Sequence, residues 1–344
     1  MRQLTLALLL CAAAGAQEPL LIDTHNDVPS RTVEGFEIGK PSKDGHTDVA
    51  RLKKGGVGAV FFSAYVDPEY AKKGQSARRA MEMIDTILND IVGRNPGEFA
   101  FARTAAEIEA AGRRGKIAAL IGVEGGHAIE DSLRLLRDYY ALGVRYMTLT
   151  HMNTNGWADS AGDLGDRAAR HHNGLTPFGK QVIGEMNRLG MMVDISHVSD
   201  KTFWDALETS RAPVFASHSS CRALCDVPRN MTDEMIVAMA KKGGVIQINF
   251  LPGFLTLRKA PAANLDDVVA HIDHVVKLAG VDAVGIGSDF DGIDRVPVGL
   301  EDVSKFPALT RALRAKGYSA ADVRKIYGGN VLRVMRAVEA VAGK

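Results

Sequence analysis

The chain has 344 residues, of which 46% are hydrophobic and 24% are charged. This composition fits a globular protein with enough apolar material for a large core, and it excludes an intrinsically disordered chain. Lys plus Arg total 42 against 41 for Asp plus Glu, so no strong net field attracts nucleic acid or an anionic membrane. The composition therefore predicts a small-molecule partner and no nucleic acid.

The first residues, MRQLTLALLLCAAAGAQ, have the order of a secretory signal peptide. Arg2 supplies a positive charge, an apolar run begins at Leu4, and small residues end the segment at Ala16. We therefore expect residues 1–16 to be removed and residues 17–344 to be exported, as a soluble periplasmic or secreted protein. No later stretch is apolar for long enough to span a bilayer, so we expect no transmembrane segment.

A glycine followed by a β-rich apolar run recurs along the chain. Each glycine can end a helix in the left-handed conformation, and the apolar run that follows is typical of a strand buried on both faces. Together with apolar runs near the start and in the middle of the chain, this pattern predicts eight strands. They lie within residues 20–27, 53–66, 113–126, 141–153, 188–199, 212–220, 241–250 and 278–290.

Helical patterns lie between these strands. In LTPFGKQVIGEMNRLG, Thr176 can cap the helix and Pro177 suits its first turn. Thr104 and Ser319 open further helices with the spacing of a capping box. Eight alternating strand and helix units predict a (β/α)8 TIM-like barrel.

The rival fold is a doubly wound open sheet, which would carry a glycine-rich phosphate turn after its first strand. The only similar segment, GGVG at 55–58, lacks the third glycine and precedes a strand. No segment after the signal peptide has the composition of a linker. We therefore expect residues 17–344 to form a single barrel domain.

Ionisable side chains gather at the predicted carboxyl ends of the strands. In a barrel, the loops from all units meet at that end, where the chemistry is carried. Burying several carboxylates and imidazoles together is costly without a counter-charge, and a pair of divalent metal ions removes that cost. The residues concerned are His25, Asp27, Glu124, His151, His197, His218 and Asp289.

Five of these residues are expected to bind metal. His25 and Asp27 are two residues apart on one strand, so their side chains point the same way and can bind one ion. His197 and His218 are expected to bind a second ion, with Glu124 between the two. Histidine nitrogen and carboxylate oxygen suit zinc in sites that stay open for water. The pattern therefore predicts two Zn²⁺ per chain, bridged by Glu124 and by a water or hydroxide.

The other histidines are expected to be ordinary polar residues, apart from one. His127 follows Glu124 closely, and for it contact with a metal ligand and a purely structural role stay open. Signatures of competing chemistry are missing from the sequence: it has no HExxH helix, no GxSxG elbow and no Walker loop. The histidines without an expected site role are His46, His171, His172, His271 and His274.

Several motifs together resemble the membrane dipeptidase family, the renal-dipeptidase-like zinc peptidases of the amidohydrolase superfamily. The similarity runs in order through nearly all of the chain after the signal segment. It includes GLEDVSKFPAL, which carries no obvious chemistry, and this makes the match specific. The other motifs are DTHND, GVEGGHAIEDSL, LGVRYMTLTHMNTNGWADS, GLTPFGKQVIGEMNRLGMMVDISHVS, APVFASHSS, RN at 229–230 and GIGSDFDG.

The resemblance implies a distorted barrel with two zinc ions that hydrolyses the peptide bond of dipeptides, with the same five metal ligands. It also implies that Asp289 is the catalytic acid/base, that His151 contacts the substrate, and that Arg229 faces the substrate carboxylate. In this mechanism a metal-bridged hydroxide attacks the peptide carbonyl, and His151 stabilises the oxyanion. Nothing in the local pattern singles out Arg229.

Some features depart from the family. Phe254 stands about where renal forms carry a tyrosine that helps to bind ligand, which leaves the preferred side chains and the tolerance of a C-terminal D-residue open. The chain ends in AVEAVAGK, without the apolar tail of a lipid-anchor signal, so an anchored form is not expected. Members of the family often dimerise, and the resemblance therefore implies a homodimer.

Two other functions compete with dipeptide hydrolysis. One is a different amidohydrolase reaction on a lactone or amide, but those enzymes more often begin with an H-x-H motif and use a carboxylated lysine after the fourth strand. Here the first motif is His25-x-Asp27 and the fourth strand ends in His151. The other is a non-catalytic exported binding protein, which a missing metal ligand would have supported; none is missing.

Overall fold

The computed structural model describes residues 20–259 and 262–343. The predicted signal peptide, residues 1–16, lies outside this part of the chain. Within the described residues, no helix combines the length and the apolar character that crossing a bilayer requires.

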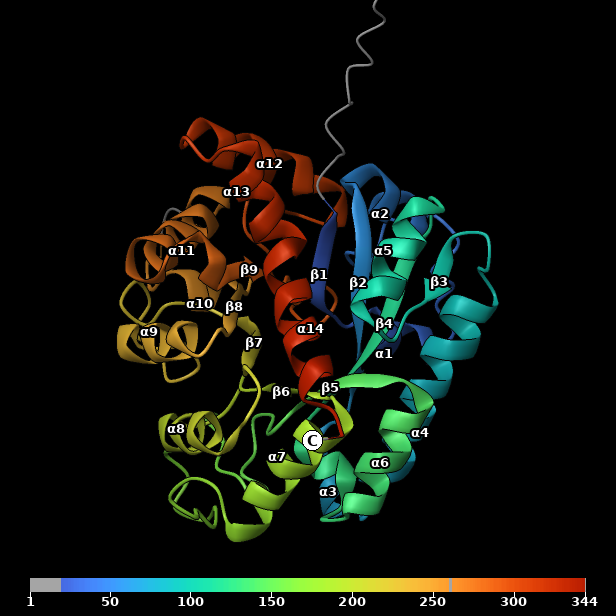
Figure 1. The fold of residues 1–344 in the computed structure, drawn as a ribbon. Coiled ribbons are helices and arrows are strands. Elements are labelled where there is room, and N and C mark those ends of the chain that lie inside the picture. Colours follow the sequence, from blue (N-terminus) through green and yellow to red (C-terminus); the bar gives the residue numbers. More distant parts are fainter. Residues whose placement is uncertain (1–19, 260–261, 344) are drawn as a thin grey trace, which may run out of the picture.

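Eight parallel strands follow one another around a nearly closed barrel, which confirms the predicted (β/α)8 fold (Figure 1). The first and last strands meet through a parallel bridge between Asn26 and Phe290, and Asp27 N donates to Phe290 O at 2.9 Å. In barrel order the strands are β1 (Leu21–Asn26), β2 (Val57–Tyr65), β4 (Ile117–Glu124), β5 (Val144–Thr148), β6 (Met192–Asp194), β7 (Phe215–Ser219), β8 (Val245–Ile248) and β9 (Val284–Ile286).

A short strand that the sequence did not predict lies beside the barrel. This strand, β3 (Phe99–Phe101), pairs in parallel with the start of β4 and is not part of the barrel path. With only three residues, two of them partly exposed, it carries no periodic signal that sequence reasoning detects.

Helices connect the strands and lie around the barrel (Figure 1). They are α1 (Val28–Thr32), α2 (Val49–Gly55), α3 (Pro68–Lys72), α4 (Ser76–Asp85), α5 (Ala105–Arg113), α6 (Leu133–Leu142), α7 (Pro177–Leu189), α8 (Asp200–Thr209), α9 (Asp233–Lys241), α10 (Pro252–Leu255), α11 (Leu265–Ala279), α12 (Phe306–Ala315), α13 (Ala320–Arg324) and α14 (Asn330–Val341). The 3₁₀ turns are η2 (Gly126–Ile129), η3 (Val281–Ala283) and η4 (Val303–Lys305), and the π turns are η1 (Thr86–Gly93) and η5 (Lys325–Gly329).

The predicted helix starts are confirmed, although one of the two predicted capping boxes forms only in part. The side chain of Thr176 accepts from the backbone N–H of Gly179, with a proline in the first turn of α7. Ser319 opens α13 with a complete capping box. Thr104 caps α5, but the carboxylate of Glu107 accepts from the N–H of Arg103, so only one half of that capping box forms.

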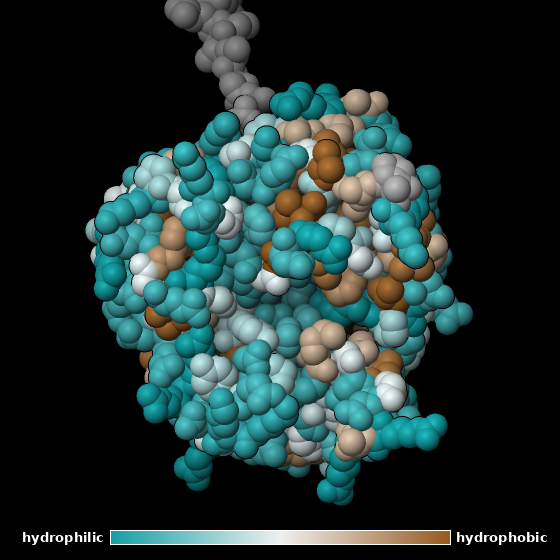
Figure 2. All heavy atoms as spheres, turned by 180° about the vertical axis from the view of Figure 1, so that it is seen from behind, coloured by the Kyte–Doolittle hydropathy of each residue, from teal (hydrophilic) through white to brown (hydrophobic). Residues whose placement is uncertain are grey.

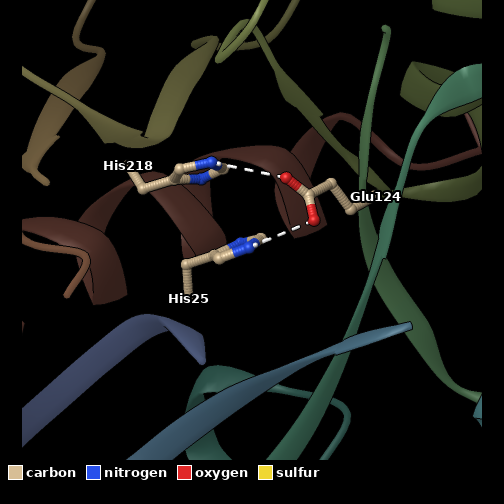
Figure 3. A group of neighbouring side chains, drawn as sticks. All are labelled: His25, Glu124 and His218. Carbon is tan, nitrogen blue, oxygen red and sulfur yellow. Dashed lines mark ion pairs between the residues drawn. The ribbon is translucent and has the colours of Figure 1, made fainter. Parts of the chain in front are cut away.

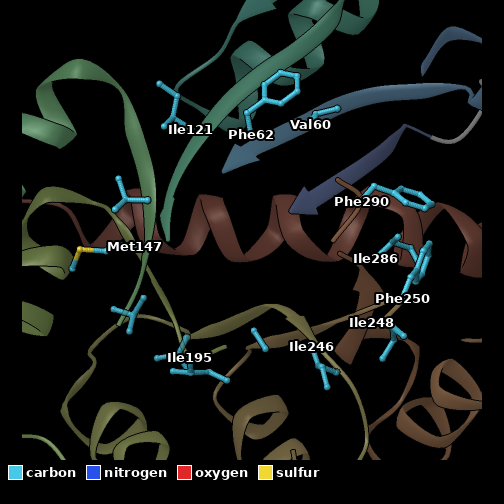
Figure 4. Close-up of a cluster of buried hydrophobic side chains, with 14 of the residues drawn as sticks. Val60, Phe62, Ile121, Met147, Ile195, Ile246, Ile248, Phe250, Ile286 and Phe290 are labelled. Atoms are coloured by element: carbon cyan, nitrogen blue, oxygen red, sulfur yellow. The ribbon is translucent and has the colours of Figure 1, made fainter. Parts of the chain in front are cut away.

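The core has two layers, because successive strand residues point to opposite faces of the barrel wall. One layer, which includes Val60 and Phe62 of β2, packs between the strands and the surrounding helices (Figure 4). The other includes Phe61 of β2 and packs with apolar side chains of α14. These inner residues belong mostly to the first halves of their strands, so α14 covers the amino-terminal end of the barrel and lies across it in Figure 1.

One glycine of the inner layer is required by a close ring contact. A Cβ atom at Gly122 of β4 would lie 1.9 Å from Cζ of Tyr146 on the neighbouring strand. Gly184, in contrast, lies on the exposed face of α7, and a Cβ there would meet nothing within 4 Å.

We predict that Gly122→Ala lowers the free energy of unfolding by about 1–3 kcal/mol through overpacking. The control, Gly184→Ala, should raise it by about 0.5–1 kcal/mol, because alanine loses less backbone entropy in a helix. Denaturant unfolding of the two variants measures both changes. A Gly122→Ala variant as stable as the wild type would contradict the packing described here.

Candidate metal centre and active site

The carboxyl ends of the strands bring the predicted polar residues together at the end of the barrel opposite α14. Glu124 is the last residue of β4, His25 and His218 lie within β1 and β7, and His197 follows β6. A cavity of about 500 Å³ opens here, lined among others by Asp27, Glu124, His151, His197 and Asp289. Figure 2 shows this face, which is hollowed at its centre and is mostly hydrophilic around the hollow.

Glu124 lies at the centre of the group, and its two oxygens face different neighbours. Oε2 is 3.4 Å from Nε2 of His25, while Oε1 is 3.1 Å from Nε2 of His197 and 3.4 Å from Nε2 of His218. Figure 3 shows the rings of His25 and His218 side by side, each with a nitrogen directed at this carboxylate. Nε2 of His151 is 3.8 Å from Oε1. One carboxylate thus connects side chains from separate strands.

The carboxylates of Asp27 and Asp289 approach the same centre from the place where the first and last strands of the barrel meet. Nε2 of His25 is 3.2 Å from Oδ2 of Asp27 and 3.9 Å from Oδ1 of Asp289. The far oxygen of Asp289 accepts a hydrogen bond of 2.9 Å from the side chain of Asn249. All of the predicted metal ligands and the predicted acid/base therefore lie in one cluster.

The rings of two histidines are held by their outer nitrogens. Nδ1 of His25 is 2.8 Å from the hydroxyl of Tyr146, and Nδ1 of His218 is 2.7 Å from the hydroxyl of Ser217. The same Ser217 hydroxyl donates to Asp194 at 2.6 Å. Both contacts leave Nε2 directed at the centre, the arrangement typical of histidines that bind a metal ion.

The cluster fits divalent metal ions. Nε2 of His25 and Oδ2 of Asp27 are buried without a hydrogen-bond partner in the part of the chain that the structure describes, and Nε2 of His197 lies 2.9 Å from Nε2 of His218. Crowded ligand atoms of this kind are stable around a cation. Within the described residues, three overlapping sets have ligand atoms within 4.8 Å of one another: His25, Glu124 and His218; Glu124, His151 and His197; and His25, Asp27 and Asp289.

These overlapping sets differ from the predicted division of the ligands. The prediction groups His197 with His218. In the structure, His151 and Asp289 also lie close enough to the other ligand atoms to take part in binding a metal ion. Glu124 belongs to two of the three sets, which agrees with its expected position between two ions.

A family model described as Membrane dipeptidase (Peptidase family M19) matches residues 13–344. The chain belongs to the membrane dipeptidase family. Dipeptidase verJ of Clonostachys rogersoniana is 42% identical over 94% of this chain and 85% of that protein, and the uncharacterized dipeptidase C965.12 of Schizosaccharomyces pombe is 40% identical over 94% and 81%.

Solved structures agree in fold. The probable dipeptidase PvdM from Pseudomonas aeruginosa superposes with a TM-score of 0.86 at 26% identity, covering 94% of this chain and 96% of that one. A metallopeptidase from Rhodobacter sphaeroides, liganded with a phosphinate mimic of the dipeptide L-Ala-D-Ala, superposes with a TM-score of 0.83 at 28% identity, covering 93% and 99%. The protein is therefore a metal-dependent dipeptidase, and the alternative of a non-catalytic binding protein is set aside.

Three residues of the dipeptidase site have protonation states that suit metal binding. His25 differs from them: burial alone would lower its pKa, but Tyr146, Glu124 and Asp27 raise it well above the usual value. Burial lowers the pKa of His197 and of His218 well below the usual value, which keeps both rings neutral at pH 7. Burial alone would raise the pKa of Glu124, but the surrounding histidines, His25 foremost, hold it well below the usual range. Neutral imidazoles and an ionised carboxylate are the forms that bind metal ions.

Two site residues have strained backbones. His197 and Asp289 adopt φ angles of 67° and 65°, in the left-handed region that residues other than glycine rarely occupy. Such strain persists only where the surroundings determine the conformation, and it concentrates at functional sites. The sequence gives no sign of it.

The structure places Arg229 beside the site and buries it. Its Nη1 donates to the hydroxyl of Ser219 at 2.7 Å and its Nη2 to the carbonyl of His218 at 2.8 Å, while Nε has no hydrogen-bond partner among residues 20–259 and 262–343. The guanidinium lies 5.5 Å from the ring centroid of Phe254, which lines the cavity. Burial lowers the pKa of Arg229 to about 10, so the group stays charged at pH 7.

Several residues that support the site were missed by sequence reasoning. Tyr146 and Asn249 orient His25 and Asp289, but each comes from another strand or loop, and no local signal marks it. Gly292 is required because a Cβ there would lie 2.4 Å from Oδ2 of Asp27; its place after DFD is the only hint in the sequence.

The open question about His127 is resolved by its hydrogen bond. Its Nε2 lies 2.9 Å from the carbonyl of Val66, which follows β2, and the bond fastens that backbone. In the described structure His127 makes no hydrogen bond to a predicted metal ligand.

We predict that Tyr146→Phe weakens divalent-metal binding by about 10- to 100-fold, because the ring of His25 loses the partner that orients it. The control is Tyr139→Phe, which removes a buried hydroxyl bonded to the carbonyl of Ala128 away from the cluster. It should lower stability and leave metal affinity unchanged. Titration against a chelator measures the affinities, and an equal change in both variants would contradict the role of Tyr146.

Proposed function

We propose that this dipeptidase is an exported binuclear zinc enzyme. In this proposal His25, Asp27 and Glu124 hold one ion, and Glu124, His197 and His218 hold the other. The observation that carries the proposal is the position of Glu124, whose Oε2 faces His25 at 3.4 Å while its Oε1 faces His197 at 3.1 Å. Bound zinc would supply a water of lowered pKa and polarise the peptide carbonyl.

Asp289 is the proposed acid/base. It takes a proton from the attacking water and returns it to the departing amine. Burial raises the pKa of Asp289 to about 8, which suits a group that must both accept and donate a proton near neutral pH. Asp291 also lines the cavity, but its Oδ1 contacts Nη1 of Arg31 at 3.2 Å and accepts the backbone N–H of His46 at 2.8 Å.

His151 is the proposed contact to the peptide oxygen. Its ring lines the cavity, and Nδ1 is buried without a partner among the described residues. Burial lowers the pKa of His151, so the ring is neutral and can donate one N–H to the developing oxyanion.

Arg229 is the proposed partner of the free carboxylate of the substrate. The charged guanidinium lies beside the cavity wall at Phe254, and its Nε has no partner among the described residues. A carboxylate there would form charge-assisted hydrogen bonds. The Rhodobacter sphaeroides relative was solved with a mimic of L-Ala-D-Ala, which supports the inclusion of dipeptides with a C-terminal D-residue.

Export, the domain boundaries and the oligomeric state are further parts of the proposal. The order of charge, apolar run and small residues supports cleavage after Ala16 and a single domain over residues 17–344. A homodimer is included in the proposal on the basis of the family resemblance. Sequencing the amino terminus of the protein recovered from its host, together with its mass in solution, tests these points.

A hydrolysis assay decides between this function and another amidohydrolase reaction. A panel of L,L and L,D dipeptides, run with defined metals and with chelator, should show chelator-sensitive cleavage of dipeptides. Preferential hydrolysis of a lactone or of a cyclic amide would assign the site to the alternative chemistry. Metal analysis of the active protein should give two zinc ions per chain.

We predict that Asp289→Asn retains metal and loses most of kcat, because the amide cannot accept the proton from water. The loss expected for a general acid/base group is about 10²- to 10⁴-fold. Steady-state kinetics and metal analysis on the same sample measure both quantities. Near-normal turnover would move the acid/base role to another residue.

We predict that Arg229→Ala raises KM for a dipeptide more than for the corresponding dipeptide amide, which lacks the negative charge. Because Arg229 also binds the carbonyl of His218, metal content must be measured alongside. Equal effects on the two substrates at unchanged metal content would remove the carboxylate assignment.

A further inference from the structure

The loop that carries Asp289 is held by a histidine outside the proposed active site. His46 lies between α1 and α2, and its Nδ1 accepts a hydrogen bond of 2.9 Å from the backbone N–H of Asp291. Its own backbone N–H donates to Oδ1 of Asp291 at 2.8 Å. Its ring also packs on Phe290, with 5.4 Å between the ring centroids. His46 therefore contacts both of the residues that follow Asp289, namely Phe290 and Asp291.

This loop needs such support because its backbone is strained. Asp289 and Asp291 have φ angles of 65° and 66°, on either side of Phe290. Left-handed conformations of residues other than glycine cost free energy and persist only where neighbouring contacts determine them. Relaxation at either residue would rotate the peptide planes that aim the carboxylate of Asp289 at the cluster.

The segment that presents His46 is itself anchored to the barrel. The hydroxyl of Thr47 accepts from the side chain of Asn26 at the end of β1, and the carbonyl of His46 accepts from the N–H of Val303. A Cβ at Gly45, whose φ is 64°, would lie 1.8 Å from Nη1 of Arg31 and 2.5 Å from Oδ1 of Asp291, so a side chain there would displace this pair. These contacts hold His46 in place, so that it can support the loop that carries Asp289.

We propose that His46 is a positioning residue for the dipeptidase reaction, which fixes Asp289 by accepting the N–H of Asp291 at Nδ1. The inference rests on the proposed role of Asp289 as the acid/base. A bond to Nδ1 requires the neutral ring with its proton on Nε2. A displacement of a reacting group by about 1 Å costs up to about 10²-fold in rate, so the effect falls on kcat.

The geometry provides a pair of variants that separates positioning from simple packing. The side-chain oxygen of asparagine takes the place of Nδ1, whereas that of glutamine reaches the place of Nε2. His46→Asn therefore keeps an acceptor for the N–H of Asp291, and His46→Gln does not. The two variants are closely matched in polarity, and both remove the ring that packs on Phe290.

The experiment measures kcat, KM and zinc content for both variants on one dipeptide. We expect His46→Gln to lower kcat by about 10- to 100-fold at unchanged KM and zinc content. His46→Asn should stay within about threefold of the wild type, and the N–H of Asp291 should exchange with solvent faster in the glutamine variant only. His274→Gln, at a half-buried histidine that contacts Asp233 between α9 and α11, is the control that should leave kcat unchanged.

The outcomes distinguish this inference from the proposed function. Equal kcat values for His46→Asn and His46→Gln, whether both are reduced or both are normal, would overturn positioning through Nδ1. A loss of rate that follows loss of zinc would overturn it as well. Asp289→Asn is measured in the same series: its inactivity keeps the acid/base role in place even if His46 proves irrelevant, whereas its full activity removes that role and the inference together.

Discussion

The arrangement of the active site depends on one buried carboxylate, that of Glu124, which lies among imidazole rings. Two oxygens of a single side chain face histidines that arrive from separate strands of the barrel. Such a cluster is stable only when its charges are balanced, since burial removes the water that would otherwise solvate them. The parallel barrel meets this requirement because all of its strands end on the same side, which lets separate segments deliver ligands to one point.

The backbone around this carboxylate is constrained as strongly as the side chains. Gly292 passes so close to Asp27 that any side chain would displace the carboxylate, and His197 and Asp289 are held in left-handed conformations. These features all lie in loops that follow strands. The strands supply the rigid frame, while the strained loops set the final direction of each group, a division of roles common to barrel enzymes.

The sequence predicts the barrel and the cluster well, because both produce local patterns. Glycine before an apolar run marks most of the strands, and a polar residue after the run marks its carboxyl end, as at Glu124. What the sequence does not reveal is the support. Tyr146, Asn249 and His46 act on residues far away in the chain, and their role arises from packing across strands. His46 even precedes a short helix, where an ordinary polar residue is the better expectation.

The electrostatic environment separates the cluster into two kinds of groups. Burial holds the rings of His197 and His218 neutral, and the neighbouring histidines hold Glu124 ionised, so these residues present lone pairs at neutral pH. Burial near the carboxylates of Asp27 and Glu124 instead raises the pKa of Asp289, so that this group can carry a proton. Titratable groups whose pKa values are driven apart within one site take different chemical roles. The same buried environment therefore distinguishes His197, His218 and Glu124, which are suited to holding a cation, from Asp289, which is suited to moving a proton. Burial raises the pKa of Asp27 as well, so its place among the metal ligands rests on its position beside His25 and not on its pKa.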